Sequence, residues 1–300
     1  MKTTKYYLAA ITAFTIWGFF SFVLKPIHQY PSLDILFYRV FVCAIVMLVI
    51  VLGFKRKALT ENATKFKALP VKGQKKFLLL NLGGGLFLTG NWFFFIYVMN
   101  HISIKATSLA YLVCPILTTL LAYFLLKEKL SKQQWLGIAL STIGCALLSF
   151  NHLTDMLFSL LVAICYALYL VSQRINAGFD KFLVLTFHVV FSALLLLPFY
   201  PSFSGPVPSS AVFYTYIIII AVVFTIIPLF LNLYALKGLT SSATGMLLNI
   251  HPIMTFIFAI SVFNEQVDAI QITAYCIVLL SVVVFNVKSK QKMAASLSNT

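Results

Sequence analysis

Long apolar runs separated by short polar segments dominate the chain. Each run has about 20 mostly apolar residues, the length at which an α-helix crosses ~30 Å of hydrocarbon. A backbone inside lipid must satisfy its own polar groups, so each run is predicted to be a transmembrane helix. The pattern predicts an all-α membrane protein with ten transmembrane helices, at residues 6–24, 34–54, 77–97, 104–126, 133–150, 156–173, 181–199, 211–235, 240–263 and 268–287. The longest connection is the basic segment 55–76.

Composition supports the same class of protein. The chain has 300 residues, of which 61% are hydrophobic and 10% are charged, whereas soluble domains average about 25% charged residues. A soluble protein of this length has too little interior to bury that much apolar surface. The bilayer is therefore the expected solvent.

The net charge of +15 is distributed unevenly along the chain. If the N-terminus is cytoplasmic, all of the 22 Lys and Arg residues except Lys25, Lys105 and Arg39 fall on the cytoplasmic side. The positive-inside rule then predicts that both termini are cytoplasmic. This placement argues against a nucleic-acid partner. The basic segment 55–76 is interpreted as a topology determinant, with contact to anionic membrane lipid as the alternative.

The chain contains an internal repeat. Residues 106–128 and 243–265 share a pattern with Thr107/Thr244, Pro115/Pro252, Thr118/Thr255 and Glu128/Glu265 in register, and Gln134/Gln271 follow at the same offset. Each half carries five expected helices, and an odd number places the halves in opposite orientations. We therefore expect two inverted five-helix repeats, at residues 1–150 and 151–287, followed by a basic cytoplasmic tail at 288–300.

The first helices of the two halves align with a slightly larger offset. That alignment places Trp17 on Tyr166 and Arg39 on His188. The segment 55–76, which has no counterpart in the second half, accounts for the change of offset.

The same motifs resemble a known family. In the first half these are Pro115, Glu128 and Gln134-Trp135-x-Gly137; the second half keeps Pro252, Glu265 and Gln271. They are similar to the EamA-type family of the drug/metabolite transporter superfamily. The stretches Gly90–Asn100 (GNWFFFIYVMN), Thr225–Leu229 (TIIPL) and Asp34–Val40 resemble the RarD branch of that family. The resemblance implies a carrier that exports a small molecule across the bacterial inner membrane.

One departure from the RarD branch concerns the seventh expected span. That branch tends to carry an acidic residue there, where this chain has Phe187-His188. A role for such a carboxylate in coupling is therefore not expected here.

Several polar side chains inside the expected spans are candidates for substrate binding. Arg39 is costly in a membrane unless it is paired or reaches the headgroups, and its planar fork suits a carboxylate or phosphate. The alternatives are snorkelling or pairing with Asp34. His188 is a candidate for proton exchange or for a structural hydrogen bond. Further substrate-binding candidates are Trp17, Asn91, Trp92, Tyr97, Tyr111, Asn232, Tyr234 and Asn249, for which helix–helix contact is the alternative.

Pro115 and Pro252 lie in the middle of the fourth and ninth expected spans. Each removes a backbone donor and bends its helix, so both are predicted hinges for alternating access. Kinks that only shape the bundle are the alternative.

No Asp or Glu is expected deep in a span, and the five cysteines lack metal-ligand spacing. We therefore expect no enzymatic activity, no cofactor and no bound metal. The expected partners are a small-molecule substrate, membrane lipid and, as a candidate through His188, a coupling proton. A membrane scaffold or regulatory protein, and a membrane-embedded enzyme, remain alternatives to the carrier.

Overall fold

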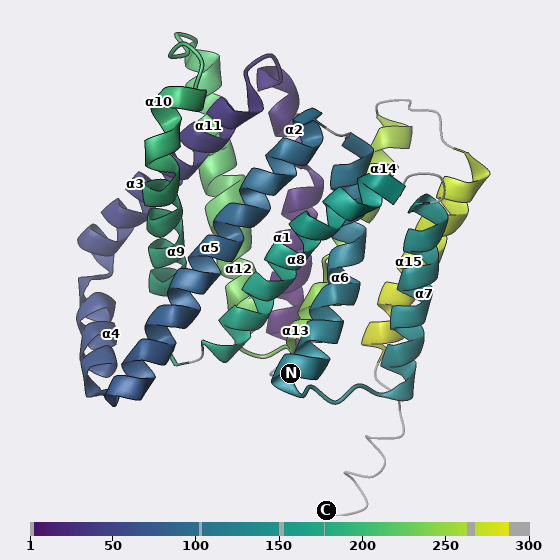
Figure 1. Cartoon of the computed structure of the whole chain (residues 1–300), viewed down its shortest axis with the longest axis horizontal. Helices are drawn as coiled ribbons and strands as arrows, with labels where there is room; N and C mark the ends of the chain where they lie inside the picture. The colour runs from purple at the N-terminus through teal and green to yellow at the C-terminus, as the bar shows by residue number, and fades with distance from the viewer. Residues whose placement is uncertain (1–2, 102–103, 150–152, 177, 263–267, 288–300) are drawn as a thin grey trace, which may run out of the picture.

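The computed structural model describes residues 3–101, 104–149, 153–176, 178–262 and 268–287, and in these residues it contains helices and no strands (Figure 1). The first half contains α1 (Thr4–Gly18), α2 (Phe20–Leu24), η1 (Lys25–Ile27), α3 (Ser32–Phe54), α4 (Arg56–Ala68), α5 (Val71–His101), α6 (Ile104–Leu126) and α7 (Lys132–Ser149). The second half contains α8 (Leu153–Ile175), α9 (Lys181–Leu196), η2 (Leu197–Phe199), α10 (Tyr200–Phe203), α11 (Ala211–Ala221), η3 (Val222–Ile226), α12 (Ile227–Ala235), α13 (Ser241–Leu247), α14 (Ile250–Ser261) and α15 (Ala269–Asn286).

Six helical segments in the described part of the chain are long and apolar enough to cross a membrane. A seventh is present if α1 and the segment Phe20–Ile27 form one bent span. The other expected spans differ for local reasons. The expected span 240–263 is divided between α13 and α14, and α7 begins with the polar residues Lys132, Gln133 and Gln134.

The repeated glutamines begin two equivalent helices. At the start of α15, Asp268 Oδ1 accepts from Gln271 N (2.7 Å) and Gln271 Oε1 accepts from Asp268 N (3.3 Å). At the start of α7, Ser131 Oγ accepts from Gln134 N (3.3 Å) and Gln134 Oε1 accepts from Ser131 N (2.9 Å). Each pair is a capping box, which satisfies N–H groups that a helix start leaves unpaired. The sequence match therefore has a structural cause.

Equivalent helices of the two halves differ in shape. The α1–α2 pair bends by 40° at Phe19, whereas its counterpart α8 is continuous. The α13–α14 pair is broken at Leu248–Asn249, whereas its counterpart α6 continues through Pro115. The α11–α12 segment contains the π-helical turn η3, whereas its counterpart α5 is a single α-helix. The irregular helices pack together: α1 lies against α12 and α14. The continuous helices also pack together: α8 lies against α5 and α6.

Equivalent helices also contact each other across the two halves. Helix α7 packs on α15, α3 packs on α9, and α6 packs on α13. Figure 1 shows α7 and α15 side by side at one edge of the molecule. At this contact Gly137 and Gly144 of α7 lie against Phe285 and Val278 of α15, so the glycines allow the close approach.

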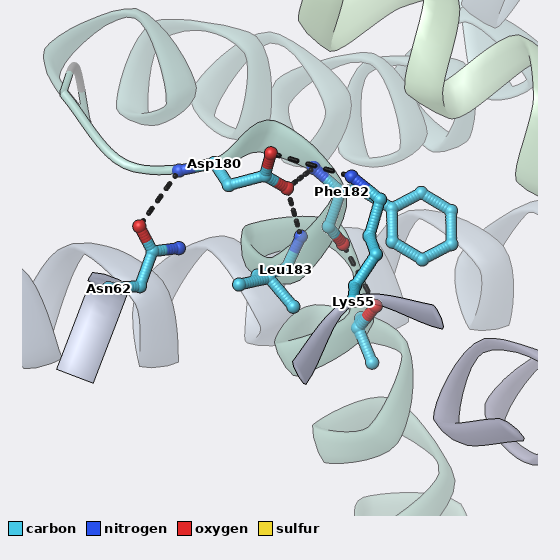
Figure 2. Close-up of polar contacts among 6 residues, drawn as sticks. Lys55, Asn62, Asp180, Phe182 and Leu183 are labelled. Carbon is cyan, nitrogen blue, oxygen red and sulfur yellow. Dashed lines mark hydrogen bonds and ion pairs between the residues drawn. The ribbon is translucent and has the colours of Figure 1, made fainter. Parts of the chain in front are cut away.

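The segment 55–76, expected as the longest connection between two spans, is largely helical, because α4 forms within it and α5 begins at Val71. Its polar and basic sequence is exposed along most of its length. Figure 2 shows how the start of α9 holds it: Asp180 N donates to Asn62 Oδ1 (3.4 Å), and Asp180 Oδ2 lies 3.5 Å from Lys55 Nζ. Asp180 Oδ1 also caps α9 by accepting from Phe182 N (2.9 Å) and Leu183 N (3.1 Å).

Candidate functional site

A cavity lies among the central helices of both halves. Its volume is about 80 Å³, room for several water molecules, since one water requires roughly 10–15 Å³ measured in this way. Most of its wall is aromatic or apolar, and the lining residues are Trp17, Phe20, Arg39, Asn91, Trp92, Phe95, Tyr111, Tyr166, Phe224, Thr225, Leu229 and His251. Arg39 is the one charged side chain among them, so an anion would be favoured in the cavity.

Arg39 projects from α3 into this cavity. Its guanidinium carbon lies 5.1 Å from the centre of the Trp92 ring, a cation–π contact. Its Nε atom is buried without a hydrogen-bond partner, and within the described ranges the guanidinium has no ion-pair partner. Pairing with Asp34 does not occur, because the Asp34 carboxylate accepts from Gly205 N at 3.0 and 3.2 Å. A planar guanidinium has the geometry to bind a carboxylate or a phosphate through two parallel hydrogen bonds.

The π-helical turn η3 contributes Phe224 and Thr225 to the wall of the cavity and is tied to α1. Pro228 has no N–H and cannot bond to the carbonyl of Phe224, four residues earlier. That carbonyl instead accepts from Trp17 Nε1 at 2.8 Å. Thr225 Oγ1 donates to the Ile220 carbonyl at 2.9 Å. The proline therefore positions the Trp17 ring at the cavity.

A hydrogen-bonded pair joins α8 to α12 beside the cavity, and Tyr166 of this pair is a lining residue. Asn232 Nδ2 donates to Tyr166 Oη at 2.8 Å, and both side chains are buried. The Tyr166 ring meets the Trp17 ring edge to face, with centroids 6.1 Å apart. Asn232 thus supports the lining from behind.

Two further polar side chains complete the lining. His251 of α14 packs its ring against Tyr111 of α6, with centroids 5.0 Å apart. Asn91 of α5 donates from Nδ2 to the Val162 carbonyl at 3.0 Å, so this amide joins α5 to α8.

A family model described as the EamA-like transporter family matches residues 4–150 and 153–287. The chain belongs to the EamA-like transporter family. The helical architecture and the apolar spans agree with an integral membrane transporter of this family.

Relatives of this EamA-like transporter cover nearly its full length. An uncharacterized transporter of Pseudomonas aeruginosa is 26% identical over 93% of this chain and 92% of its own. An uncharacterized Bacillus subtilis transporter, YojE, is 26% identical over 99% of both chains. Protein RarD of Salmonella typhi is 26% identical over 95% of both chains. A solved crystal structure of a protein with 15% sequence identity shares the fold, with a TM-score of 0.72 over 94% of this chain and 96% of that one. The resemblance to the RarD branch is thus confirmed.

The cavity of this EamA-like protein brings together some predicted site residues and leaves others apart. Trp17, Arg39, Asn91, Trp92 and Tyr111 line it, and Asn232 lies directly behind it. Tyr97 is 42% exposed on α5. Tyr234 stacks near Tyr6, with centroids 5.2 Å apart, and Lys237 Nζ lies 5.7 Å from its ring centre. Neither tyrosine lines the cavity.

His188 and Asn249 also lie outside this cavity, and both are fully buried. Asn249 sits at the break between α13 and α14, and both atoms of its amide lack a partner. His188 belongs to a separate polar cluster between α5 and α9, where its Nε2 lies 3.2 Å from Asn81 Oδ1.

The two predicted hinges of the EamA-like fold lie in different settings. Pro115 is inside the continuous helix α6, with its carbonyl accepting from Thr119 Oγ1 at 2.8 Å. Pro252 lies three residues after the break at Asn249, where the Leu248 carbonyl accepts from His251 N (3.1 Å) instead of from the missing proline N–H.

Sequence reasoning missed five lining residues, Phe20, Phe95, Phe224, Thr225 and Leu229. The available signal for the last three was the motif Thr225–Leu229, because a proline inside a long apolar run marks the place where backbone carbonyls become free.

Proposed function

We propose that the protein is a secondary transporter that exports a small anionic or zwitterionic compound, such as an amino acid or another carboxylate, by alternating access. In this proposal it has ten transmembrane helices in two inverted halves, residues 1–150 and 151–287. Both termini and the basic tail 288–300 are in the cytoplasm, and the membrane is the bacterial inner membrane.

The observation that carries the proposal is the environment of Arg39. Arg39 is partly buried, its Nε has no partner, and a cation so placed without a counter-charge is costly, so the site favours a state in which an anion is present. The guanidinium carbon lies over the Trp92 ring, 5.1 Å from its centre, and the guanidinium fork suits a carboxylate. The remaining wall, with Trp17, Tyr111 and Tyr166, suits an apolar or aromatic body.

The inverted repeat is supported by contacts between equivalent parts. Two residues related by a two-fold axis can touch only if both lie near that axis. Trp17 and Tyr166, which align between the halves, touch at the cavity. Equivalent helices also pack on each other, as for α3 with α9. The substrate site of inverted-repeat carriers lies at the interface between the repeats.

Alternating access is supported by the different shapes of equivalent helices. The group α1, α11–α12 and α13–α14 is bent or broken, while its counterpart group α8, α5 and α6 is continuous. In a symmetric carrier the opposite-facing state exchanges the two shapes. Pro252 is then the hinge in use in this state, and Pro115 is the hinge for the other state.

A thermal-shift screen of the purified protein tests the proposal. The probes are aliphatic and aromatic carboxylates, amino acids and uncharged aromatic compounds. An anion that binds the folded protein raises the melting temperature, because stabilisation follows RT ln(1 + [L]/Kd). We expect stabilisation by carboxylates in the wild type and its loss in Arg39→Gln. Lys57→Gln, which removes an exposed charge on α4, serves as the matched control and should keep the shift.

Other outcomes separate the alternatives. Equal stabilisation of wild type and Arg39→Gln by carboxylates would contradict the anion site. Stabilisation by uncharged aromatic compounds in both proteins would favour a hydrophobic drug as substrate. The absence of any ligand, together with normal function of Arg39→Gln in cells, would favour a scaffold or regulatory role.

A further inference from the structure

Several polar groups in the wall of the Arg39 cavity are already used by the fold. Trp17 Nε1, Thr225 Oγ1 and Asn91 Nδ2 donate to backbone carbonyls at 2.8, 2.9 and 3.0 Å. The Tyr166 hydroxyl accepts from a buried amide of α12. Arg39 differs from them, because its Nε is buried and has no hydrogen-bond partner. The guanidinium is therefore available to hold the polar end of a ligand.

The lining residues include one cation, Arg39, and no carboxylate. In the described part of the chain, the buried Asp34 carboxylate accepts from Gly205 N at 3.0 and 3.2 Å, and the Glu128 carboxylate is held at the start of α13. A bound carboxylate would neutralise the Arg39 guanidinium, since the two match in charge and in geometry. An ammonium group would find no counter-charge among the lining residues.

The wall therefore distinguishes a simple carboxylate from an amino acid. In an amino acid the ammonium is attached to the carbon beside the carboxylate, so a carboxylate bound to Arg39 brings a second cation close to the guanidinium. That ammonium would also lose its water without gaining an acidic partner. An aromatic face can attract a cation, but the Arg39 guanidinium carbon already lies over the Trp92 ring, 5.1 Å from its centre. The ammonium should thus weaken binding.

The single guanidinium also limits the number of negative charges on a ligand. Arg39 can neutralise one carboxylate, whereas a second carboxylate or a doubly charged phosphate would bring an unpaired negative charge into the same largely apolar wall. A charge buried without a partner is costly. The wall therefore favours a ligand with one negative charge.

Aromatic side chains form most of the remaining wall. Seven of the twelve lining residues are Phe, Tyr or Trp, and they come from α1, α2, α5, α6, α8 and η3. Rings from both halves thus offer their faces and edges to an aromatic body. The cavity volume of about 80 Å³ is room for several waters, so it suits a compact body with one ring.

We infer that the substrate is a monocarboxylate with one aromatic ring and no ammonium group. Arg39 binds the carboxylate, and the ring-lined wall, which includes the contact between Trp17 and Tyr166, packs against the aromatic body. This inference rests on the proposed transport function and narrows it, because the charge of the wall disfavours amino acids, dicarboxylates and phosphates. Shape alone would admit the aromatic amino acids.

Tryptophan fluorescence of the full chain in detergent micelles tests this substrate class. The chain has three tryptophans, of which Trp17 and Trp92 line the cavity and Trp135 is 41% exposed on α7. Trp135→Phe therefore leaves emission from the cavity alone. Three probes share a benzyl group and differ at the carbon beside the carboxylate, which carries only hydrogen in hydrocinnamate, an ammonium in free phenylalanine and a second carboxylate in benzylmalonate. Hydrocinnamamide, which is uncharged, and propionate, which has no ring, complete the set.

We expect hydrocinnamate to bind about tenfold more tightly than each of the other probes, or better, because each of them adds an unpaired charge or lacks an anchor. In Arg39→Gln, made in the same background, hydrocinnamate and hydrocinnamamide should bind alike, since the wall no longer prefers a negative charge. Lys57→Gln, which removes an exposed charge from α4, is the matched control and should keep the preference.

Free phenylalanine that binds as tightly as hydrocinnamate would overturn the inference, and so would tighter binding of benzylmalonate or equal binding of propionate. In these three outcomes a carboxylate still binds in the cavity, so the proposed export of an anion stands. A preference for hydrocinnamate over its amide that persists in Arg39→Gln would remove Arg39 from both proposals. If neither these carboxylates nor those of the thermal-shift screen bind, the proposed function fails together with this inference.

Discussion

Trp17 and Tyr166 meet edge to face at the cavity, with ring centroids 6.1 Å apart and planes inclined by 72°. They lie in α1 and α8, the first helices of the two halves, and they align in the repeat. Each also holds a polar partner in the second half: Trp17 donates to the Phe224 carbonyl, and Tyr166 Oη accepts from Asn232. In the proposed carrier the two-fold axis passes between these rings, so the cavity lies where the two halves must separate.

The hydrogen bond from Trp17 Nε1 to the Phe224 carbonyl should contribute measurably to the stability of the fold. Trp17→Phe keeps an aromatic ring and removes the indole N–H from which the Phe224 carbonyl accepts. Such a loss costs about 1–3 kcal/mol, so the melting temperature of the purified protein should fall. Pro228→Ala in the same chain supplies an N–H to that carbonyl and should recover part of the loss.

Trp135→Phe provides the control, because Trp135 is 41% exposed on α7. The interpretation of η3 fails if Trp17→Phe melts like Trp135→Phe. It also fails if Pro228→Ala lowers the stability of Trp17→Phe further.

Much of the fold was predictable because its signals are local. Long apolar runs produce helices wherever they occur in lipid, and the repeated Gln134 and Gln271 produce capping boxes in both halves. The depth of Arg39 in an apolar run marked it as a site residue, and the structure places it at the cavity. Each of these inferences depends on the sequence of a single helix and not on how helices pack.

The remaining features depend on which helix faces meet. A membrane chain is apolar on nearly every face, so periodicity gives little contrast between an inward and an outward side. His188 could therefore not be separated from Arg39 by sequence, although it packs in another cluster. The break at Leu248–Asn249 was likewise hidden, since Pro115 in the equivalent position sits in a continuous helix.

Two glycines offer a test of helix contact between the halves. A Cβ on Gly245 of α13 would stand 2.8 Å from Thr118 Cβ of α6, whereas a Cβ on Gly53 of α3 would meet nothing within 4 Å. Gly245→Ala should destabilise the protein by about 1–3 kcal/mol through overpacking. Gly53→Ala should be neutral or stabilising by up to about 1 kcal/mol, since alanine favours a helix. Thermal unfolding of both variants checks the difference, and equal melting temperatures would contradict this packing.

Asp180 at the start of α9 takes part in both a helix cap and an ion pair, and variants can distinguish their contributions to stability. Asp180 Oδ1 accepts from two N–H groups of α9, while Oδ2 faces Lys55 at 3.5 Å. Asp180→Ala should cost about 0.5–2 kcal/mol, the range for a lost N-cap. Lys55→Gln should cost at most about 1 kcal/mol, because the pair is partly exposed. Asp180→Asn, which can still cap, should resemble Lys55→Gln. A Lys55→Gln loss as large as that of Asp180→Ala would show that the ion pair dominates.

The first-half copy of the repeated glutamate, Glu128, has defined hydrogen-bond partners in the second half. Glu128, just after α6, accepts from Ser241 N (2.9 Å), Ser242 N (3.2 Å) and Ser242 Oγ (2.6 Å), and so joins α6 to the start of α13. Its counterpart Glu265 lies outside the described residues. Because hydrogen bonds to a charged group contribute about 1.5–3 kcal/mol, Glu128→Ala should lower the melting temperature clearly, and Glu128→Gln should lower it less.

Glu61→Ala removes an exposed carboxylate from α4 and is the matched control. If Glu128→Ala melts at the same temperature as Glu61→Ala, the carboxylate does not hold α13. If Glu128→Ala melts at a lower temperature than Glu61→Ala, the link between α6 and the broken α13–α14 segment stabilises the observed conformation. Because α13 leads through the break at Asn249 to His251, which lines the cavity, loss of the link should also weaken carboxylate binding in the thermal-shift screen. Unchanged binding in a destabilised Glu128→Ala would mean that the link supports the fold and leaves the cavity unaffected.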